Sequence, residues 1–499
     1  MLLCFVFLAG CTPASNQDDR SAWVRYGTGT PMQTFDPHLA DTGPSFSTYI
    51  ALVYDGLTRV DTEKMGNAVP GLASDWRWID NRTLEFDLRP GVRFIDGEPF
   101  NARAAVANIE RMIEKNGPRI ATVASVKSAE AIGELKLRLN LAYPDPTVLY
   151  NLALSPGMMV SPAAFDNADL DLNPVGTGAW IYDQENSRIG EVHRFRLNPD
   201  YYEGHPPGRA PYEIYVLKDT RARLNALVSG QIDFTVMGAS EADYAKKSGF
   251  FIASRKNRWL GLTLLDRQGI LVPAFRDVRV RRALGFAVDR DALARVVYFG
   301  FAAPASQPMA DLGHVRALEN YYTYDPAHAR ALLEEAGAVG TYFEVPVVPT
   351  SSAEYEAIQH YVNQVGFNME IKIIEPGTIA PIARSLDYPI NTIGYPNFDP
   401  DNRHTAIWGS DAAFNPFRNP TPRLNELAQQ ARETLDEAQR AALFQEYFQI
   451  VVTEAHSVIY LQVEDLVAYD ADKLIDVTVS RYIDPNLSDV RLRNHVGQE

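Results

Sequence analysis

The chain has 499 residues, 46% of them hydrophobic, and a formal net charge of -16 at pH 7. This length exceeds what a single hydrophobic core usually supports, so we expect more than one compact unit. Because nucleic-acid binding needs clustered Lys and Arg, the acidic balance argues against a nucleic-acid partner. After the first ten residues, no stretch approaches the roughly 18 uninterrupted apolar residues of a membrane-spanning helix.

A short apolar segment that ends in a cysteine opens the chain. Residues 1–10 are mostly apolar, and Leu8 to Cys11 reads L-A-G-C, which resembles a bacterial lipobox with Cys11 as the lipidated residue. A signal segment usually starts with basic residues and spans about 15–30 residues. Since no Lys or Arg precedes Cys11, we expect the true start to lie upstream. A truncated or buried strand is the alternative.

A polar segment follows the cysteine. Residues 12–21 read T-P-A-S-N-Q-D-D-R-S and contain too little apolar surface to fold, so a flexible tether is expected. The second cysteine of the chain, Cys4, precedes Cys11. Cleavage of the signal and lipidation would therefore leave no free thiol and no disulfide, and cysteine usage would not report the redox compartment.

Residues 84–118 predict a β-β-α unit. Apolar and charged residues alternate over 84–88 and again over 92–94, and the Pro-Gly turn signal at 90–91 between them predicts a hairpin. Asn101 is a good N-cap, and apolar residues then recur at helical spacing until the Asn-Gly-Pro at 116–118. A helix should therefore follow the hairpin.

The other elements of the first half have weaker sequence signals. The pattern predicts a strand at 22–26, a helix at 47–53, a strand at 134–141, backbone turns at Gly176 and Gly178, a helix C-cap at Gly230 and an extended segment at 260–265. A phosphate-binding loop is the alternative for the glycines, but no G-x-x-x-x-G-K-[ST] pattern or third glycine supports it.

Capped helices dominate the second half. Helix starts are expected after the caps Asp277, Asp289 and Asp325. The arginines of the first of these helices are expected on its solvated face rather than in an anion site: Arg279, Arg281 and Arg282. A strand–helix–strand unit with parallel strands is expected at 343–348, 353–365 and 367–374, followed by helices at 423–435 and 438–454.

Catalytic and metal-binding motifs are missing from the sequence. The nine histidines form no H-E-x-x-H and have no neighbouring cysteine, so neither a zinc site nor a cofactor is expected. No G-x-S-x-G elbow occurs. A carboxylate pair assembled in space stays open, but solvated Asp and Glu are the simpler interpretation.

Several motifs, in a fixed order, resemble the family 5 extracellular solute-binding proteins, which are the peptide, nickel and related receptors of ABC importers. They are T-F-D-P at 34–37, Y-D-G-L at 54–57, P-x-L-A-x-x-W at 70–76, L-R-x-G-V-x-F-x-D-G-x-P-F at 88–100, N-P-V-G-T-G-A-W at 173–180, R-L-N-P-D-Y-Y-E-G at 196–204, A-L-V-S-G-Q-I-D-F at 226–234, D-P-x-N at 399–402 and D-x-x-x-R at 436–440. The resemblance covers nearly the whole chain from Tyr26.

This resemblance implies an α/β fold with the two-lobed architecture of type II periplasmic binding proteins. Hinge crossings would join the lobes, and the first lobe would carry an extra subdomain. The implied division is signal 1–11, tether 12–21, lobe I at 22–46, 172–262 and 478–499, extra subdomain 47–171, and lobe II at 263–477.

The same resemblance implies a substrate-binding component that captures a solute, peptide-like by preference, in an interlobe cleft. Its partners would be an ABC permease and that permease's ATPase subunits. A periplasmic or other extracytoplasmic, lipid-anchored monomer without enzymatic activity is expected. The alternatives are a receptor for a sugar, opine, metal chelate or haem, a secreted hydrolase, or a transcription regulator, for which no basic helix-turn-helix segment precedes Tyr26.

Candidate ligand-binding residues also come from the resemblance: Thr42, Gly43, Tyr395, Asn397, Asp399 and Trp408. Core packing is the alternative for Trp408. In dipeptide receptors of this family, an Asp three residues before the Asp of the D-P-x-N loop binds the ligand amine; here that position is Pro396. The arginine that holds the ligand carboxylate has no counterpart in V-P-V-V-P-T-S at 345–351. Free dipeptides are therefore expected to bind weakly.

Overall fold

The computed structural model describes residues 22–40, 46–61, 67–309, 313–392, 394, 399–479 and 485–495. Its strands are β1 Val24–Thr28, β2 Thr58–Val60, β3 Ala68–Pro70, β4 Ala73–Asp80, β5 Thr83–Leu88, β6 Val126–Ala131, β7 Lys136–Leu141, β8 Trp180–Tyr182, β9 Val192–Leu197, β10 Tyr212–Val216, β11 Phe234–Met237, β12 Phe251–Leu264, β13 Ala302–Pro304, β14 Tyr342–Val347, β15 Asn368–Ile373, β16 Ile390–Asn391, β17 Ser457–Tyr469, β18 Leu474–Ile475 and β19 Arg491–Leu492.

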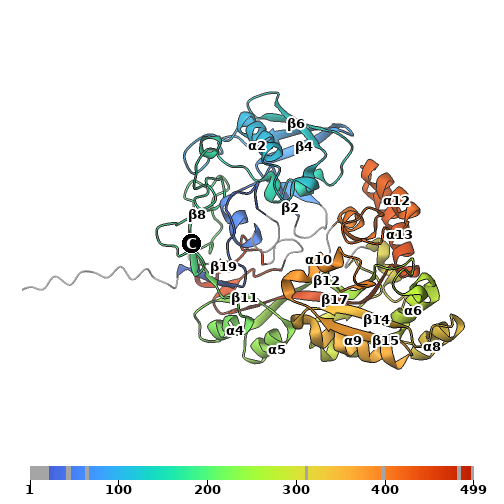
Figure 1. Cartoon of the computed structure of the whole chain (residues 1–499). Coiled ribbons are helices and arrows are strands. Elements are labelled where there is room, and N and C mark those ends of the chain that lie inside the picture. Colours follow the sequence, from blue (N-terminus) through green and yellow to red (C-terminus); the bar gives the residue numbers. More distant parts are fainter. Residues whose placement is uncertain are drawn as a thin grey trace, which may run out of the picture.

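Helices connect and cover these strands (Figure 1). They are α1 Ala51–Val53, α2 Ala102–Lys115, α3 Val148–Asn151, α4 Thr220–Val228, α5 Ala239–Lys247, α6 Val278–Ala287, α7 Arg290–Val296, α8 Pro326–Glu335, α9 Ser352–Gln364, α10 Ile379–Ala383, α11 Pro400–Arg403, α12 Pro422–Glu433 and α13 Glu437–Thr453. No helix among the described residues is long and apolar enough to cross a bilayer.

Two long antiparallel strands, β12 Phe251–Leu264 and β17 Ser457–Tyr469, lie side by side in the largest sheet of the described residues. They pair from Phe251↔Tyr469 to Thr263↔Ser457. In the described part of the sheet, the order continues from β17 through β11, β1, β10 and β9 to β8, while β16 pairs with β12 and β13 pairs with β17. The extended crossing was predicted only from 260, but β12 already begins at Phe251 because polar residues at its start pair with β17 as regularly as the apolar ones.

Irregular pairing marks the middle of this crossing. The register shifts between Lys256 and Arg258 and again between Leu260 and Gly261. Asn257 lies at the first shift and donates a hydrogen bond from its Nδ2 to Oδ2 of Asp465 at 2.7 Å. Because bulges locally interrupt a ladder and increase its twist, these positions are where the two strands can bend with least loss of pairing.

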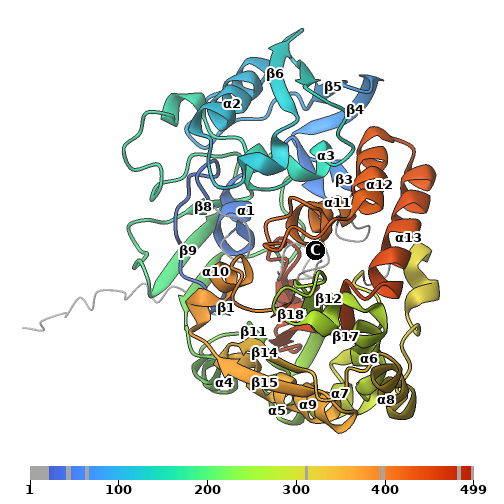
Figure 2. The ribbon, with the colours of Figure 1, turned by 45° about the vertical axis from the view of Figure 1, so that its right-hand side comes forward.

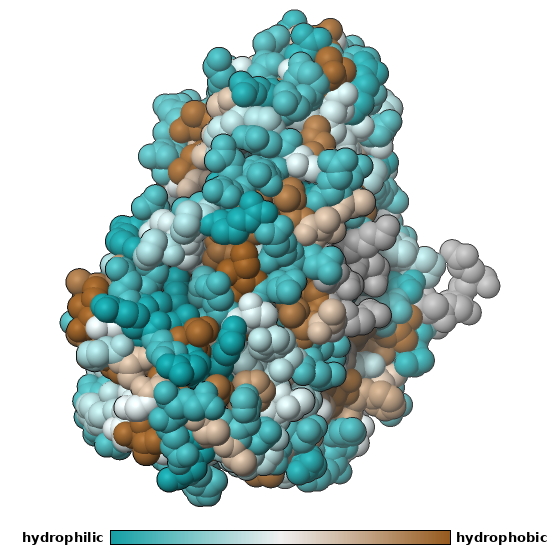
Figure 3. Space-filling model, turned by 90° about the vertical axis from the view of Figure 1, so that its right-hand side faces the viewer, coloured by the Kyte–Doolittle hydropathy of each residue, from teal (hydrophilic) through white to brown (hydrophobic). Residues whose placement is uncertain are grey.

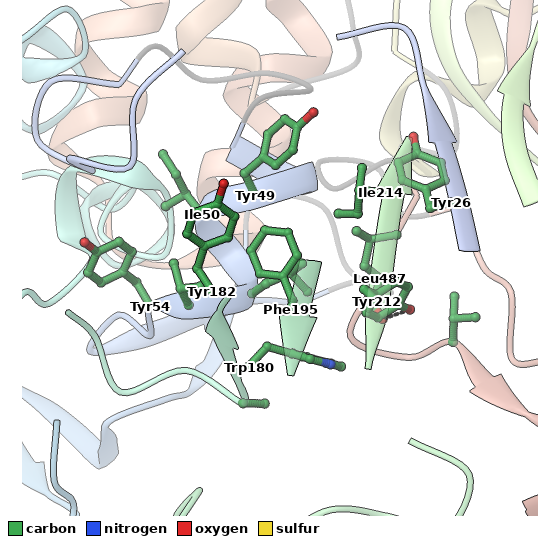
Figure 4. Packing of buried hydrophobic residues seen from close by; sticks show 14 of the residues in the cluster. Tyr26, Tyr49, Ile50, Tyr54, Trp180, Tyr182, Phe195, Tyr212, Ile214 and Leu487 are labelled. Carbon is green, nitrogen blue, oxygen red and sulfur yellow. Dashed lines mark hydrogen bonds between the residues drawn. The ribbon is translucent and has the colours of Figure 1, made fainter. Parts of the chain in front are cut away.

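Aromatic side chains fill the core of the first lobe (Figure 4). Tyr182 lies against Phe195 with ring centroids 5.2 Å apart. Two polar aromatic groups are satisfied by backbone carbonyls, since Trp180 Nε1 donates to Ala210 O and Tyr212 Oη donates to Leu487 O. Leu487, near the end of the described chain, lies in this same core.

The subdomain has a four-stranded antiparallel sheet in the order β4-β5-β7-β6, which lies at the top of Figure 1 with α2. The hairpin predicted between 84–88 and 92–94 is wrong: β5 pairs with β4 and β7, and 92–94 is not a strand. Val92 and Phe94 are buried in the same core as β5, so their alternation reflects packing of a loop rather than pairing.

Helix α2 confirms the helix that was predicted to begin after Asn101. It begins after Asn101, whose Oδ1 accepts hydrogen bonds from the backbone N–H groups of Arg103 and Ala104. Asn116 then ends it in the left-handed conformation, with φ 47°. The buried face carries Ala105, Ile109 and Met112, as the helical spacing predicts.

The second lobe confirms most predicted elements. Strands β14 and β15 are parallel and are connected by α9. The caps Asp277, Asp289 and Asp325 each accept a backbone hydrogen bond at the start of α6, α7 and α8. The predicted solvated position of Arg281 is wrong. This side chain is buried and donates to the backbone carbonyls of Phe275, Arg276 and Glu454.

The two glycines of the N-P-V-G-T-G-A-W segment were predicted as turn residues, but the structure gives them a different role. Gly176 and Gly178 are absent from the positive-φ glycines. Instead, an added Cβ at either position would collide with the backbone of Val53. Gly178 N also donates to Val53 O at 3.0 Å. The glycines are therefore needed for close approach to the end of α1.

Candidate functional site

Two loops carry most of the predicted ligand-binding residues. Thr42, Gly43, Tyr395 and Asn397, together with Pro396 and the predicted lipidation residue Cys11, lie outside the described residues. The chain next to each loop is described: Asp36 and His38 precede the first loop, and Asp399 follows the second. In both places a buried carboxylate binds an arginine.

The first anchor joins the T-F-D-P motif to helix α2. Arg111 donates from Nη1 to Oδ1 of Asp36 at 2.9 Å and from Nη2 to Oδ2 at 2.7 Å. Both side chains are only 6% exposed. Burial opposes ionisation of Asp36, but the hydrogen bonds and charge of Arg111 outweigh it and hold its pKa below the usual value. A buried ion pair thus attaches the T-F-D-P segment to helix α2.

His38 completes this anchor as a neutral residue. Its Nδ1 lies 2.8 Å from Nη1 of Arg111, and its Nε2 lies 3.2 Å from Met158 O. Because a guanidinium can only donate, Nδ1 must accept and Nε2 must carry the proton. Burial, helped by the charge of Arg111, lowers the pKa of His38 to about 4.

The second anchor unites two motifs of the sequence, D-P-x-N and D-x-x-x-R. Asp399 is 2% exposed, and Nη2 of Arg440 lies 2.9 Å from each of its carboxylate oxygens. Its Oδ1 also accepts from Asp401 N at 2.8 Å, at the start of α11. Asp399 is therefore engaged within the protein, and positioning the loop before it is the role that this geometry supports.

A parallel ion pair lies beside the second anchor. Nε of Arg432, on α12, lies 2.8 and 2.9 Å from the two carboxylate oxygens of Asp401. Burial lowers the pKa of Arg432, but the hydrogen bonds and charge of Asp401, with smaller contributions from Tyr143 and Asp145, raise it above its usual value. Tyr143 and Asp145 belong to the segment 47–171 that is assigned to the subdomain. Groups of the subdomain therefore contribute to the electrostatic environment of Arg432.

Figure 2 shows α3, which follows Asp145, on the side of the subdomain that faces α11 and α12. Asp145 is fixed there by hydrogen bonds from Ser125 Oγ at 2.6 Å and from Thr147 N at 2.9 Å. No sequence motif marks Tyr143 or Asp145 as functional. Their role depends on the approach of segments almost 300 residues apart, which periodicity cannot reveal.

Trp408 lies in the core of the second lobe. It is 0% exposed, its Nε1 donates to Ser457 Oγ at 2.9 Å, and its ring contacts Tyr447 and Phe448 edge-on. The structure thus gives Trp408 a packing role. Its contact with a ligand stays a prediction, without an exposed surface to support it.

Metal binding receives no support from the part of the chain that the structure describes, which contains no group of three or more His, Cys, Asp or Glu side chains placed to hold an ion. The buried charged groups of the site form Asp–Arg pairs instead. Such pairs fix loops and exclude water, and they hold no activated nucleophile or free general base.

Comparison with known proteins gives a consistent result. Residues 67–415 match the family of bacterial extracellular solute-binding proteins, family 5 Middle. The chain is 25% identical over 475 residues to the glutathione-binding protein GsiB of Pectobacterium atrosepticum, covering 89% of each chain. It is 26% identical over 481 residues to di/tripeptide-binding protein 1 of Pseudomonas aeruginosa, covering 85% of this chain and 87% of that protein.

Solved structures share the fold. NikA from Brucella suis, in complex with Fe(III)-EDTA, matches with a TM-score of 0.83 and 23% identity over 94% of this chain and 99% of that one. The substrate-binding protein CtaP of Listeria monocytogenes matches with a TM-score of 0.82 and 21% identity, with the same coverage of the two chains. The family match extends over more than half of the chain, from β3 in the subdomain past Asp399 of the second anchor. The chain therefore belongs to the family 5 bacterial extracellular solute-binding proteins.

Proposed function

We propose that this substrate-binding protein captures a peptide-like solute in a cleft between its lobes and delivers it to an ABC permease, with ATP hydrolysed by the permease's partner subunits. The observation that carries the proposal is the family match over 67–415. The names of the relatives, which bind glutathione or di- and tripeptides, favour a peptide-like solute. A sugar, opine, metal chelate or haem is the alternative ligand class on this fold.

Hinge closure supplies the mechanism. A ligand bound to one lobe gains contacts with the other only when the lobes are shut, so binding shifts the open–closed equilibrium. The lobes of this proposal are residues 22–46, 172–262 and 478–499, with the extra subdomain 47–171, and residues 263–477. The register shifts in the β12–β17 ladder are the bending positions, and the two anchored loops are the ligand-binding surfaces.

The candidate ligand contacts in this proposal are Thr42, Gly43, Tyr395 and Asn397, with Asp399 as a positioning residue. No catalytic role is proposed. The family's extracellular location places the protein outside the cytoplasm. On the face drawn in Figure 3, hydrophilic residues predominate and apolar residues form small separate groups. A monomer is part of the proposal, and this face contains no extended apolar patch that would argue against it.

Free dipeptides are expected to bind weakly or not at all. Pro396 and the segment 345–351 provide neither of the charged groups that would hold a dipeptide's ends, and burying an unpaired charge costs several kcal/mol. Longer peptides, or amide- and sugar-like solutes, should bind better. Native mass spectrometry of the purified protein identifies the bound solute, and calorimetry with a dipeptide panel measures the preference. Sub-micromolar affinity for an unmodified dipeptide would show this inference to be wrong.

Lipid anchoring at Cys11 is the second part of the proposal that can be tested directly. L-A-G-C followed by a polar segment supports it. In cells that express the chain with its full leader and a radiolabelled fatty acid, the wild type should be labelled and the Cys11→Ala variant should not. Cys4→Ala is the matched control and should label normally. Equal labelling of the wild type and Cys11→Ala would exclude lipidation at this residue.

A further inference from the structure

A pocket of about 240 Å³ lies among residues that the proposal assigns to the first lobe and its subdomain. It is bounded by α1, β2, β3, β8 and the chain segment before β19. None of the described residues that line it lies between Arg209 and Asn486, so the second lobe does not contribute to it. Its volume is below the roughly 300–1,000 Å³ of pockets for drug-sized ligands, and a solute of amino-acid size fits it.

On one wall of this pocket, the charged side chains are paired with one another. Arg59 donates from Nη1 to Glu203 at 2.8 Å and from Nη2 to Asp55 at 3.1 Å. The hydroxyls of Tyr201 and Tyr202 lie 2.7 and 2.6 Å from the same Nη2. Asp55 and Glu203 therefore already share a cation, and the charges of these three side chains are paired with one another.

Arg209, on another wall, is held in place but poorly hydrogen-bonded. Its guanidinium lies 5.1 Å from the ring centre of Trp180 and 5.9 Å from that of Tyr201. It makes one long hydrogen bond, from Nη2 to Ser488 O at 3.3 Å, and its buried Nε has no partner. Stacking fixes the plane of the fork, while most of its donors stay available.

An opposite charge lines the same pocket. Asp489 is exposed to solvent, and its Oδ2 accepts from Asn486 Nδ2 at 2.6 Å. The described residues contain no ion pair between Asp489 and Arg209. The pocket therefore presents a cation and an anion that form no direct ion pair with each other, together with the exposed apolar side chain of Val69.

We propose that this pocket binds a small zwitterion of amino-acid size, with its carboxylate on the guanidinium of Arg209 and its ammonium group at Asp489. A guanidinium fork matches a carboxylate with two parallel hydrogen bonds. The side chain of the solute lies against Val69, an exposed lining residue. Asp399, the described residue assigned to the interlobe cleft, is not among the described residues that line this pocket.

Saturation-transfer NMR on the full chain, with glycine and L-alanine as probes, tests this site. Acetate and methylammonium, which each carry one of the two charges, should bind more weakly than either amino acid. Arg209→Gln and Asp489→Asn should each weaken amino-acid binding by about tenfold, since each removes a charge-assisted contact. Arg188→Gln, at an exposed ion pair with Glu191 outside the pocket, is the control and should bind as the wild type does.

Two results would overturn the proposal. One is the absence of saturation transfer to either amino acid at millimolar concentration. The other is an affinity that neither Arg209→Gln nor Asp489→Asn changes, which would place the amino acid elsewhere, including the interlobe cleft. Asp489 is exposed, so its variant should retain the wild-type melting temperature and keeps the test valid even where Arg209→Gln unfolds.

Discussion

Arg111→Ala is expected to destabilise the protein by about 3–5 kcal/mol, the usual cost of removing one partner of a buried ion pair. Asp36 would keep a buried charge without its arginine, and Nδ1 of His38 would lose its donor. Chemical denaturation, followed by the fluorescence of the first-lobe tryptophans, measures the shift. Because Asp36 stands just before the loop with Thr42 and Gly43, ligand affinity should fall as well.

The matched control is Arg188→Ala. Its ion pair with Glu191 has side chains that are 74% and 67% exposed, and exposed pairs contribute about 0–1 kcal/mol. A double variant, Asp36→Asn with Arg111→Met, should recover much of the loss because no unpaired charge stays buried. An Arg111→Ala variant as stable as the control would contradict the anchoring role of this pair.

Acidification from about pH 6.5 towards 4 is expected to destabilise the protein through its buried histidines. Four buried histidines have depressed pKa values: burial lowers those of His38, His193 and His404 to about 4 and that of His456 to about 3. In the unfolded chain a histidine titrates near 6.5. Since the unfolded state then binds more protons, stability is complete above about pH 6.5 and is lost as the pH falls towards 4.

Each histidine with a pKa near 4 contributes up to about 3 kcal/mol to this loss, because one pKa unit corresponds to about 1.36 kcal/mol. Denaturation midpoints between pH 7.5 and 4.5 measure the slope. His404→Gln should flatten it, since a neutral amide can still bond to the hydroxyl of Tyr447, which lies 3.0 Å from Nδ1 of His404. His360→Gln, at an exposed position, should leave the slope unchanged. A midpoint independent of pH over this range would refute the account.

Local signals in the sequence were sufficient for elements whose ends are chemically marked. Asn101 before α2 and Asp325 before α8 both cap their helices as predicted. The β14–α9–β15 unit was also predictable because its helix is long enough to return the chain parallel to the first strand. These features depend on neighbours a few residues apart, which a single sequence shows directly.

Long-range contacts account for the predictions that were wrong or incomplete. Arg281 has helical spacing typical of a solvated face, but the carbonyl of Glu454, 173 residues away, accepts two of its hydrogen bonds. The 92–94 segment alternates like a strand, yet β4 takes the pairing position beside β5. Likewise, the two motifs around Asp399 and Arg440 could each be recognised, but only the fold shows that they form one ion pair.

Lobe closure on the solute is the central claim of this account, and small-angle X-ray scattering tests it most directly. The solute identified by native mass spectrometry would first be removed by unfolding and refolding, and scattering would then be recorded with and without it. We expect the bound protein to have a smaller radius of gyration, with a stabilisation of about 2.7 kcal/mol at a ligand concentration near 100 Kd. Identical scattering profiles for the free and saturated protein would contradict closure of the lobes around the ligand.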